Sequence, residues 1–198
     1  MPPEPSELIL ASHNAGKLKE FRAVLGQRWI LRPQSDFAIS DIDETGATFV
    51  ENALLKARHA SHHGGLPALA DDSGLVVPAL GGDPGLRSAR YSGAGDAANN
   101  RLLLDKMAHL EGDGRDAFFI AVLVLLRHAE DPTPVIAEGR WRGRIAHAPK
   151  GQEGFGYDPL FIPEGHERHS AELPAEEKNR ISHRALAIQQ LLKQLTIA

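Results

Sequence analysis

The chain of 198 residues contains no cysteine. This absence excludes disulfide bonds, thiolate nucleophiles and cysteine-ligated zinc, and it favours a reducing compartment. Long hydrophobic runs are also missing, since the longest, Ala117–Leu126, is about half of a membrane span. The first seven residues have neither the basic nor the apolar region of a signal peptide. We therefore expect a soluble, cytoplasmic protein.

Positive charge is also scarce. Lysine and arginine number 22 against 26 acidic residues, giving a net charge of −4, so composition gives no indication of a nucleic-acid or anionic-membrane surface. Glycine and proline, at 19 and 13 residues, stay below the share typical of low-complexity chains. Hydrophobic residues at 42% and charged residues at 24% are typical of a globular protein, and we expect one domain over residues 1–198.

Short apolar segments alternate with amphipathic ones along the chain. Apolar runs predict strands at Leu8–Ala11, Leu66–Ala70, Leu75–Leu80, Ala117–Leu126 and Val135–Trp141. Helical spacing predicts helices over Leu18–Leu25, from Thr48 to Gly64, from Asp96 to about Leu110, and over Ile181–Leu195. This alternation favours an α/β fold in which Ala117–Leu126 is a central strand and Val135–Trp141 is its antiparallel partner, which makes the sheet mixed.

Several helix ends are marked by capping residues. Thr48 and Glu51 fit a capping box, and glycines at 64 and 65 end that helix. Asp96 is suited to cap the next helix, and Ser182 to cap the last one.

The turn Ser12–Lys17 joins the first strand to the first helix. Free N–H groups at a helix N-terminus favour an anion, Ser12 and Asn14 add polar groups, and Lys17 adds a positive charge. These features outline a phosphate site without the Walker pattern. An ordinary turn with a solvated lysine explains the same residues equally well.

Adjacent carboxylates at Asp71 and Asp72 follow an apolar strand. Hard oxygen ligands suit Mg²⁺, which binds few protein carboxylates and bridges to phosphates. The alternative is that one aspartate caps the turn while the other is solvated. A second acidic segment, residues 41–44, is either a further metal site or a solvent-exposed acidic loop. We assign Glu51 mainly to the capping box.

Histidines and aromatic residues allow two interpretations. His59, His62 and His63 lie at a helix end, where cations are stabilised by the dipole, so we do not assign them to a metal. His183 and Arg184 at a helix start oppose the dipole, which favours a nearby anion or polar ligand. Phe155 and Tyr157, among glycines, are either core residues or a stacking surface for a flat ring.

The chain resembles a known family, the inosine-triphosphatase-like nucleotide pyrophosphatases (XTP/dITP diphosphatases). The resemblance runs from Leu8 to the last helix and is carried by seven segments in the expected order: Ser12–Lys17, Glu44–Gly46, Thr48–Ala53, Ala70–Leu75, Ser88–Tyr91, Phe155–Pro159 and Ile181–Arg184. One departure is His13, where the family usually has glycine.

The resemblance implies hydrolysis of purine nucleoside triphosphates such as ITP, dITP and XTP to the monophosphate and pyrophosphate, which cleans the nucleotide pool. It implies that Asp72 accepts a proton from water and, with Glu44, binds the cofactor Mg²⁺. The implied triphosphate contacts are Ser12, His13, Asn14, Ala15, Gly16, Lys17, Lys56, Ser73 and Lys178. The implied purine contacts are Phe155, Gly156, Tyr157, Asp158, His183 and Arg184.

The implied fold is an elongated mixed β-sheet whose flanking helices form two lobes around a central cleft, assembled as a homodimer. The residue chemistry agrees with this function. A hydrogen-bond donor such as Arg184 would bind the 6-keto oxygen of a base and would discriminate against adenine, which has an amino group there. With lysines holding the phosphate tail and Asp72 beside Ser73, we expect water to attack the α-phosphorus.

Two rival functions remain. A Maf-like pyrophosphatase acts on pyrimidine or modified nucleotides, and a substrate panel separates it. A nucleotide-binding sensor without catalysis would need no water-activating carboxylate, so Glu44, Asp71 and Asp72 weigh against it.

Overall fold

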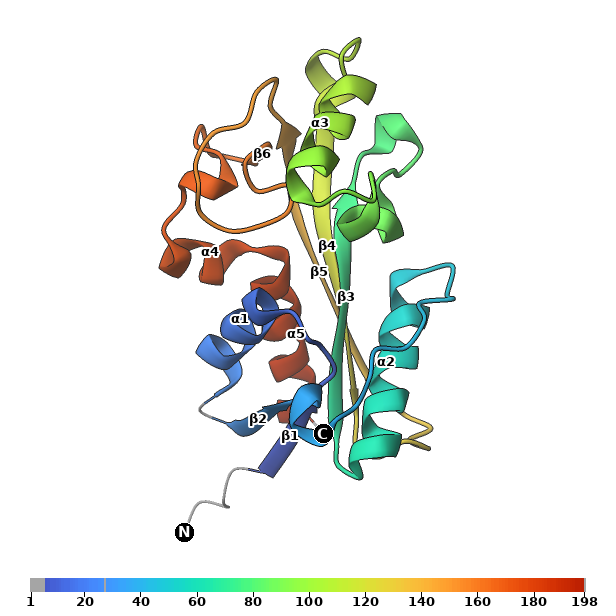
Figure 1. Cartoon of the computed structure of the whole chain (residues 1–198). Coiled ribbons are helices and arrows are strands. Elements are labelled where there is room, and N and C mark those ends of the chain that lie inside the picture. Colours follow the sequence, from blue (N-terminus) through green and yellow to red (C-terminus); the bar gives the residue numbers. More distant parts are fainter. Residues whose placement is uncertain (1–5, 27, 198) are drawn as a thin grey trace. The chain divides into compact units, whose positions relative to one another are not determined.

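A six-stranded mixed sheet carries the fold (Figure 1). The computed structural model describes residues 6–26 and 28–197, so the segment assessed above for a signal peptide lies largely outside it. The strand order is β2-β1-β3-β4-β5-β6. The strands are β1 Ser6–Leu10, β2 Trp29–Pro33, β3 Ala68–Val76, β4 Asp116–Leu126, β5 Val135–Ile145 and β6 Phe161–Pro163. β1 pairs in parallel with β2 and β3, and β6 is antiparallel to β5, so the predicted mixed sheet is confirmed.

Helices flank this sheet. They are α1 Ala15–Leu25, α2 Phe49–Gly64, α3 Asp96–Lys106, α4 Ala175–Ile181 and α5 His183–Ile197, with short 3₁₀ turns between some elements. Within the described ranges, none of the helices combines the length and the apolar character that crossing a membrane requires.

The chain forms two compact units. Unit 1 contains the described residues up to Asp72, Ala121–Glu138 and the chain from Ala187 onward. Unit 2 contains Ser73–Ile120 and Gly139–Leu186. Strands β3, β4 and β5 each contribute residues to both units.

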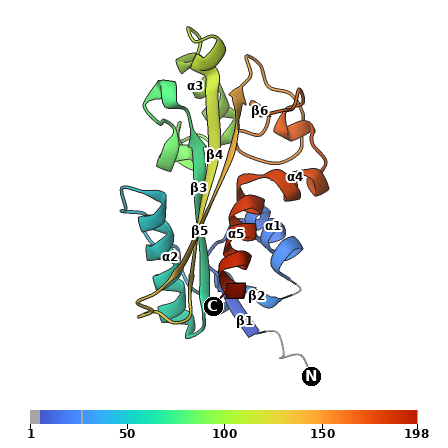
Figure 2. The same cartoon turned by 180° about the vertical axis from the view of Figure 1, so that it is seen from behind.

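Unit 1 has an apolar cluster on each face of its sheet. Leu8 and Leu10 of β1 pack in one cluster with Phe21 of α1 and Ile188 of α5. Ile9, between them, packs in the other cluster, with alanines of α2. Successive side chains of a strand point to opposite faces, so this alternation places α1 and α5 on one face and α2 on the other (Figure 2).

Unit 2 has its own core, rich in aromatic residues. Phe119 of β4, Trp141 of β5 and Phe161 of β6 are buried together with Leu103 of α3. The ring centroids of Phe119 and Phe161 lie 4.8 Å apart in an edge-to-face arrangement, which is favourable for aromatic pairs.

The predicted turn between the strands Leu66–Ala70 and Leu75–Leu80 is wrong. Two strands were expected on either side of Asp71 and Asp72, but β3 runs continuously from Ala68 to Val76. Each carboxylate lies within ion-pair distance of a lysine, so the strand tolerates two buried charges without turning away. Beyond Val76, the residues Pro78–Leu80 form a 3₁₀ turn instead of the predicted strand.

Helix boundaries also differ from the predictions at three points. Asp96 is the first residue of α3 instead of its cap, which is Gly95, and the helix ends at Lys106 instead of near Leu110. Ile181 ends a separate helix, α4, and Ser182 interrupts the path between α4 and α5. Ser182 accepts a hydrogen bond from the Ala185 N–H, so its predicted capping role is confirmed. Thr48 caps α2 as predicted.

Candidate active site

The turn after β1 is organised by its own polar side chains. Asn14 caps α1 through its Oδ1, which accepts a hydrogen bond from the Lys17 N–H at 3.0 Å. Ser12 Oγ accepts from the Asn14 N–H at 3.1 Å. The turn therefore presents the N-terminal end of an 11-residue helix, where backbone N–H groups and the helix dipole favour an anion.

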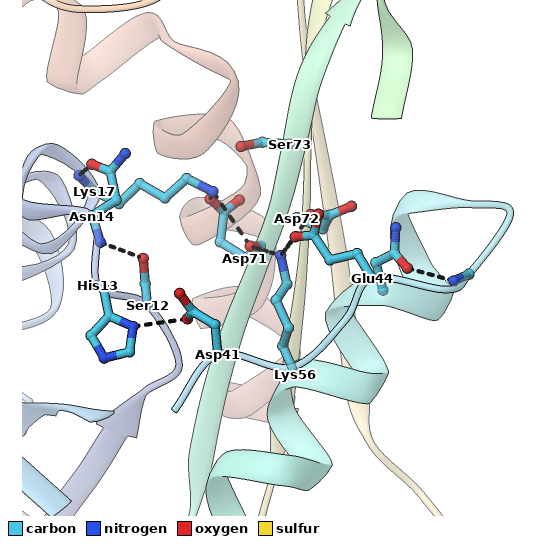
Figure 3. A network of polar contacts seen from close by, with 12 residues as sticks. Ser12, His13, Asn14, Lys17, Asp41, Glu44, Lys56, Asp71, Asp72 and Ser73 are labelled. Carbon is cyan, nitrogen blue, oxygen red and sulfur yellow. Dashed lines mark hydrogen bonds and ion pairs between the residues drawn. The ribbon is translucent and has the colours of Figure 1, made fainter. Parts of the chain in front are cut away.

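Asp71 and Asp72 lie on opposite sides of β3, each beside a lysine (Figure 3). The ammonium group of Lys17 lies 2.7 Å from Asp71 Oδ2. The ammonium group of Lys56, from α2, lies 2.6 Å from Asp72 Oδ1 and 3.0 Å from Glu44 Oε1. Lys56 also donates to the carbonyl oxygen of Asp71 at 2.9 Å. We call these five residues the acid–lysine cluster.

Burial and charge act together on the ionisation of this cluster. Burial raises the pKa of Asp72, and the neighbouring Glu44 and Asp71 add to the rise, whereas Lys56 opposes it. Burial by itself lowers the pKa of Lys56, but the three carboxylates more than offset it, so its pKa lies above the usual value. Within these five residues, three carboxylates face two ammonium groups, so the cluster by itself carries an excess of negative charge.

This excess fits a divalent cation. Glu44 and Asp72 converge on one point, which the Lys56 ammonium group contacts, and their oxygens are the hard ligands that Mg²⁺ prefers. In the part of the chain that the structure describes, no three histidine or acidic residues form a ready-made metal site. A pair of carboxylates is nevertheless the donor set expected for Mg²⁺ in a phosphate site, because the ion takes its remaining ligands from water and substrate.

His13 is directed toward the loop that leads to Glu44. Its Nδ1 lies 2.8 Å from Asp41 Oδ1 and 2.9 Å from Nε2 of the buried Gln34. Gln34 also donates to the same Asp41 oxygen at 2.8 Å. Nδ1 of His13 thus faces two protein groups, and the phosphate contact of this residue stays a prediction.

Other candidate ligands have structural partners. The Glu51 N–H donates to the Thr48 hydroxyl at 3.3 Å, the N-cap contact of the predicted capping box, and the Glu51 carboxylate accepts from the same hydroxyl at 2.7 Å. His59, His62 and His63 pack ring against ring at the end of α2.

In unit 2, Asp158 organises the glycine-rich loop. Its Oδ2 accepts from the Phe155 N–H at 2.9 Å and lies 2.5 Å from the Lys178 ammonium group. Its Oδ1 accepts from the Ser170 hydroxyl at 2.7 Å. Lys178 of α4 is itself buried, so this ion pair ties the loop to α4.

Phe155 has cations on its ring. The Lys178 Nζ lies 5.5 Å and the Arg184 Cζ 5.4 Å from the ring centroid, within the range of cation–π attraction. Arg184, in the first turn of α5, also donates from Nη2 to the Ser73 hydroxyl at 2.8 Å. Phe155 is half-buried.

Two further predicted purine contacts are deeply buried. His183 stacks on Phe119 with centroids 4.9 Å apart and planes 13° apart. Tyr157 donates from its hydroxyl to the Ser88 carbonyl at 2.9 Å, and burial raises its pKa. Of the two aromatic residues in the loop, Tyr157 is thus a core residue, whereas Phe155 is half-buried.

The structure brings the predicted site residues together as two sets, one in each unit. The first contains Ser12–Lys17, Glu44, Lys56, Asp71 and Asp72, and the second contains Ser73, Phe155–Asp158, Lys178, His183 and Arg184. The peptide bond between Asp72 and Ser73 joins them covalently. Sequence reasoning missed the supporting residues Gln34 and Ser170, because a lone polar residue carries no periodic or motif signal.

The fold and these contacts define an α/β protein with a mixed sheet, in which an acid–lysine cluster lies beside the N-terminal end of α1. The model of the Ham1 family matches residues 8–194. The chain belongs to the Ham1 family, and the predicted family is confirmed.

Relatives agree over nearly the whole chain. A protein of Pseudomonas syringae pv. tomato named dITP/XTP pyrophosphatase is 55% identical over 191 residues, covering 96% of this chain and 97% of its own. A protein of the same name from Pseudomonas aeruginosa is 56% identical over 189 residues, with 95% of each chain covered. The solved structure of a HAM1 protein from Coxiella burnetii superposes with a TM-score of 0.89 at 47% identity, covering 97% of this chain and 99% of that one.

Proposed function

We propose that this protein hydrolyses non-canonical purine nucleoside triphosphates, dITP, XTP and ITP, to the monophosphate and pyrophosphate, with Mg²⁺ as cofactor. The relatives that are more than half identical are named for dITP and XTP. The observation that carries the proposal is the acid–lysine cluster, which combines excess negative charge for a metal ion with lysines for phosphate groups.

Glu44 and Asp72 are the proposed ligands of Mg²⁺. The bound ion would supply Lewis-acid neutralisation of the phosphate oxygens. Lys17, Lys56 and the N–H groups of the Ser12–Lys17 turn would hold phosphate groups of the substrate, which positions the reacting phosphorus.

Asp72 is the proposed proton acceptor for the attacking water. Its burial favours this role, because a carboxylate with limited solvation is a stronger base than one in water. Pyrophosphate then leaves as one unit, with its developing charge balanced by the positively charged groups around it.

Arg184 and Phe155 are the proposed base-recognition pair. The Phe155 ring offers a stacking surface, and the Arg184 guanidinium is a donor suited to the O6 acceptor of hypoxanthine or xanthine. Adenine presents an amino donor at that position, so binding it would leave a buried donor unpaired, at a cost in affinity.

Hydrolysis of ITP in ¹⁸O-water tests the proposed site of attack. Attack at the α-phosphorus puts the label in inosine monophosphate and leaves pyrophosphate unlabelled, which mass spectrometry of the two products distinguishes. Label in pyrophosphate would place the attack at the β-phosphorus, and free orthophosphate with IDP would place it at the γ-phosphorus. Either result contradicts the proposal.

The family resemblance further supports a homodimer, with twice the chain mass of 21.5 kDa. Sedimentation equilibrium measures this mass directly.

A further inference from the structure

Two side chains of α3 hold both polar groups of a single peptide residue, Gly156. Asp96 Oδ2 accepts a hydrogen bond from the Gly156 N–H at 2.7 Å. Asn100 Nδ2 donates to the Gly156 carbonyl oxygen at 2.9 Å. Asp96 and Asn100 are four residues apart and therefore lie on one face of the helix. All three residues belong to unit 2.

Two hydrogen bonds from α3 act on Gly156 in addition to the turn hydrogen bond that the Asp158 N–H donates to the Phe155 carbonyl oxygen at 3.3 Å. The φ of Gly156 is +63°, in the left-handed region that favours glycine. A Cβ at this position would meet nothing within 4 Å, so the positive φ, and not a close contact, is what favours glycine here. Glycine has the widest range of backbone conformations of any residue, and the hydrogen bonds to the Gly156 N–H and carbonyl oxygen limit that range.

The neighbours of Gly156 are secured in other ways. The Phe155 N–H is bound by Asp158, and the Tyr157 hydroxyl is bound by the Ser88 carbonyl. Gly156 therefore links Tyr157, which is anchored in the core, to Phe155, whose side chain is half-buried. A rotation of the Gly156 peptide would redirect the Phe155 ring.

Helix capping does not explain these contacts. The N-cap of α3 is Gly95, and no side chain caps the helix there, although Asp96 is a residue type that suits the cap. The Asp96 carboxylate binds an amide 60 positions away instead.

We propose that Asp96 and Asn100 are positioning residues for base recognition: by holding the Gly156 peptide they fix the ring of Phe155 on which the purine stacks. The inference rests on the proposed function for its substrate, but not for the hydrogen bonds themselves.

Kinetics of variants test the effect on the substrate. In Asp96→Ala and Asn100→Ala the KM for ITP rises about tenfold each while kcat changes less than about twofold, because binding geometry is lost and the hydrolytic residues are untouched. Asp96→Asn, which keeps an acceptor oxygen, restores most of the affinity. Asp105→Ala removes the same charge from an exposed position of α3 and leaves KM unchanged.

Amide hydrogen exchange of ¹⁵N-glycine-labelled protein tests the hydrogen bonding of the Gly156 peptide without any substrate. The Gly156 amide exchanges at least about tenfold faster in Asp96→Ala than in the wild type, and Asp96→Asn restores its protection. The Gly154 amide serves as an internal reference. Unchanged exchange would overturn the inference, and so would faster exchange with an unchanged KM. A wild-type protein that releases no pyrophosphate from ITP or XTP would instead contradict the proposed function, whatever the exchange rates show.

Discussion

At the scale of single residues, the acid–lysine cluster shows how buried charges become compatible with a strand. Asp71 and Asp72 are 2% and 7% exposed, and each has a lysine within 2.7 Å. Removing one member of such a pair leaves its partner charge uncompensated, so substitutions must preserve shape and polarity to be informative about catalysis.

Asp72→Asn keeps the size of the side chain and removes the proposed base. We expect kcat for ITP to fall by about 100-fold or more, because both proton acceptance and metal binding depend on this carboxylate. The initial rate of pyrophosphate release measures the loss. Asp43→Asn, in the exposed part of the acidic loop, removes a charge elsewhere and should leave kcat unchanged. A near-normal rate in Asp72→Asn would exclude Asp72 as the base.

Arg184→Ala tests base selection. The value of kcat/KM should fall about 10- to 100-fold for ITP and much less for ATP, because only the 6-keto base uses the guanidinium donor. Parallel assays with the two nucleotides give the ratio. Arg180→Ala, an exposed position on α4, is the matched control. Equal losses on both substrates would show that Arg184 supports phosphate binding or folding instead.

At the scale of elements, the connection between β4 and β5 depends on one buried carboxylate. Asp131 Oδ2 accepts hydrogen bonds from the Arg127 N–H at 3.0 Å and Nε at 2.8 Å, and its Oδ1 accepts from the Thr133 N–H at 3.0 Å. The Arg127 side chain, followed by these backbone N–H groups, holds the pKa of Asp131 far below its usual range.

This shift makes the contribution of Asp131 to stability dependent on pH. A lowered pKa in the folded state stabilises the protein fully above the unfolded-state pKa of about 3.9, and the contribution is lost as pH falls below it. The Tm difference between wild type and Asp131→Asn should therefore be constant near neutral pH and shrink below about pH 4. Calorimetry across this range measures it, with the exposed Glu130→Gln as control. A difference that stays constant down to pH 3 would contradict the assignment.

At the scale of the whole molecule, two units with separate cores share three strands. β3, β4 and β5 each run from one unit into the other. Unfolding of these strands in one unit therefore disrupts the same strands in the other unit. We therefore expect the units to unfold together.

The two tryptophans of the chain report on the units separately. Trp29 packs in a unit 1 cluster and Trp141 in the core of unit 2. Trp29→Phe leaves only Trp141 as a fluorophore, and Trp141→Phe leaves only Trp29. In each variant, the urea midpoint of tryptophan fluorescence should equal the urea midpoint of circular dichroism. Separate midpoints in a single variant, one by fluorescence and one by circular dichroism, would show that the units unfold independently.

Local patterns in the sequence determined most of the elements. The apolar run Ala117–Leu126 predicted a central strand because such continuity requires cover on both faces, and β4 lies between β3 and β5. Thr48 and Ser182 predicted helix starts because capping depends on a side chain reaching an amide only a few residues away. The motifs around Lys17, Asp72 and Arg184 likewise named the family, since they depend on residue identity and order.

Only the tertiary structure decided features that depend on distant partners. Asp71 and Asp72 suggested a turn because isolated carboxylates avoid burial, and Lys17 and Lys56, from two different helices, made a continuous strand possible. Asp96 suggested a cap because aspartate is a favoured N-cap residue, but its carboxylate binds the Gly156 amide instead. Residue type determines which hydrogen bonds a side chain is able to make, and the folded chain determines which partner comes within reach.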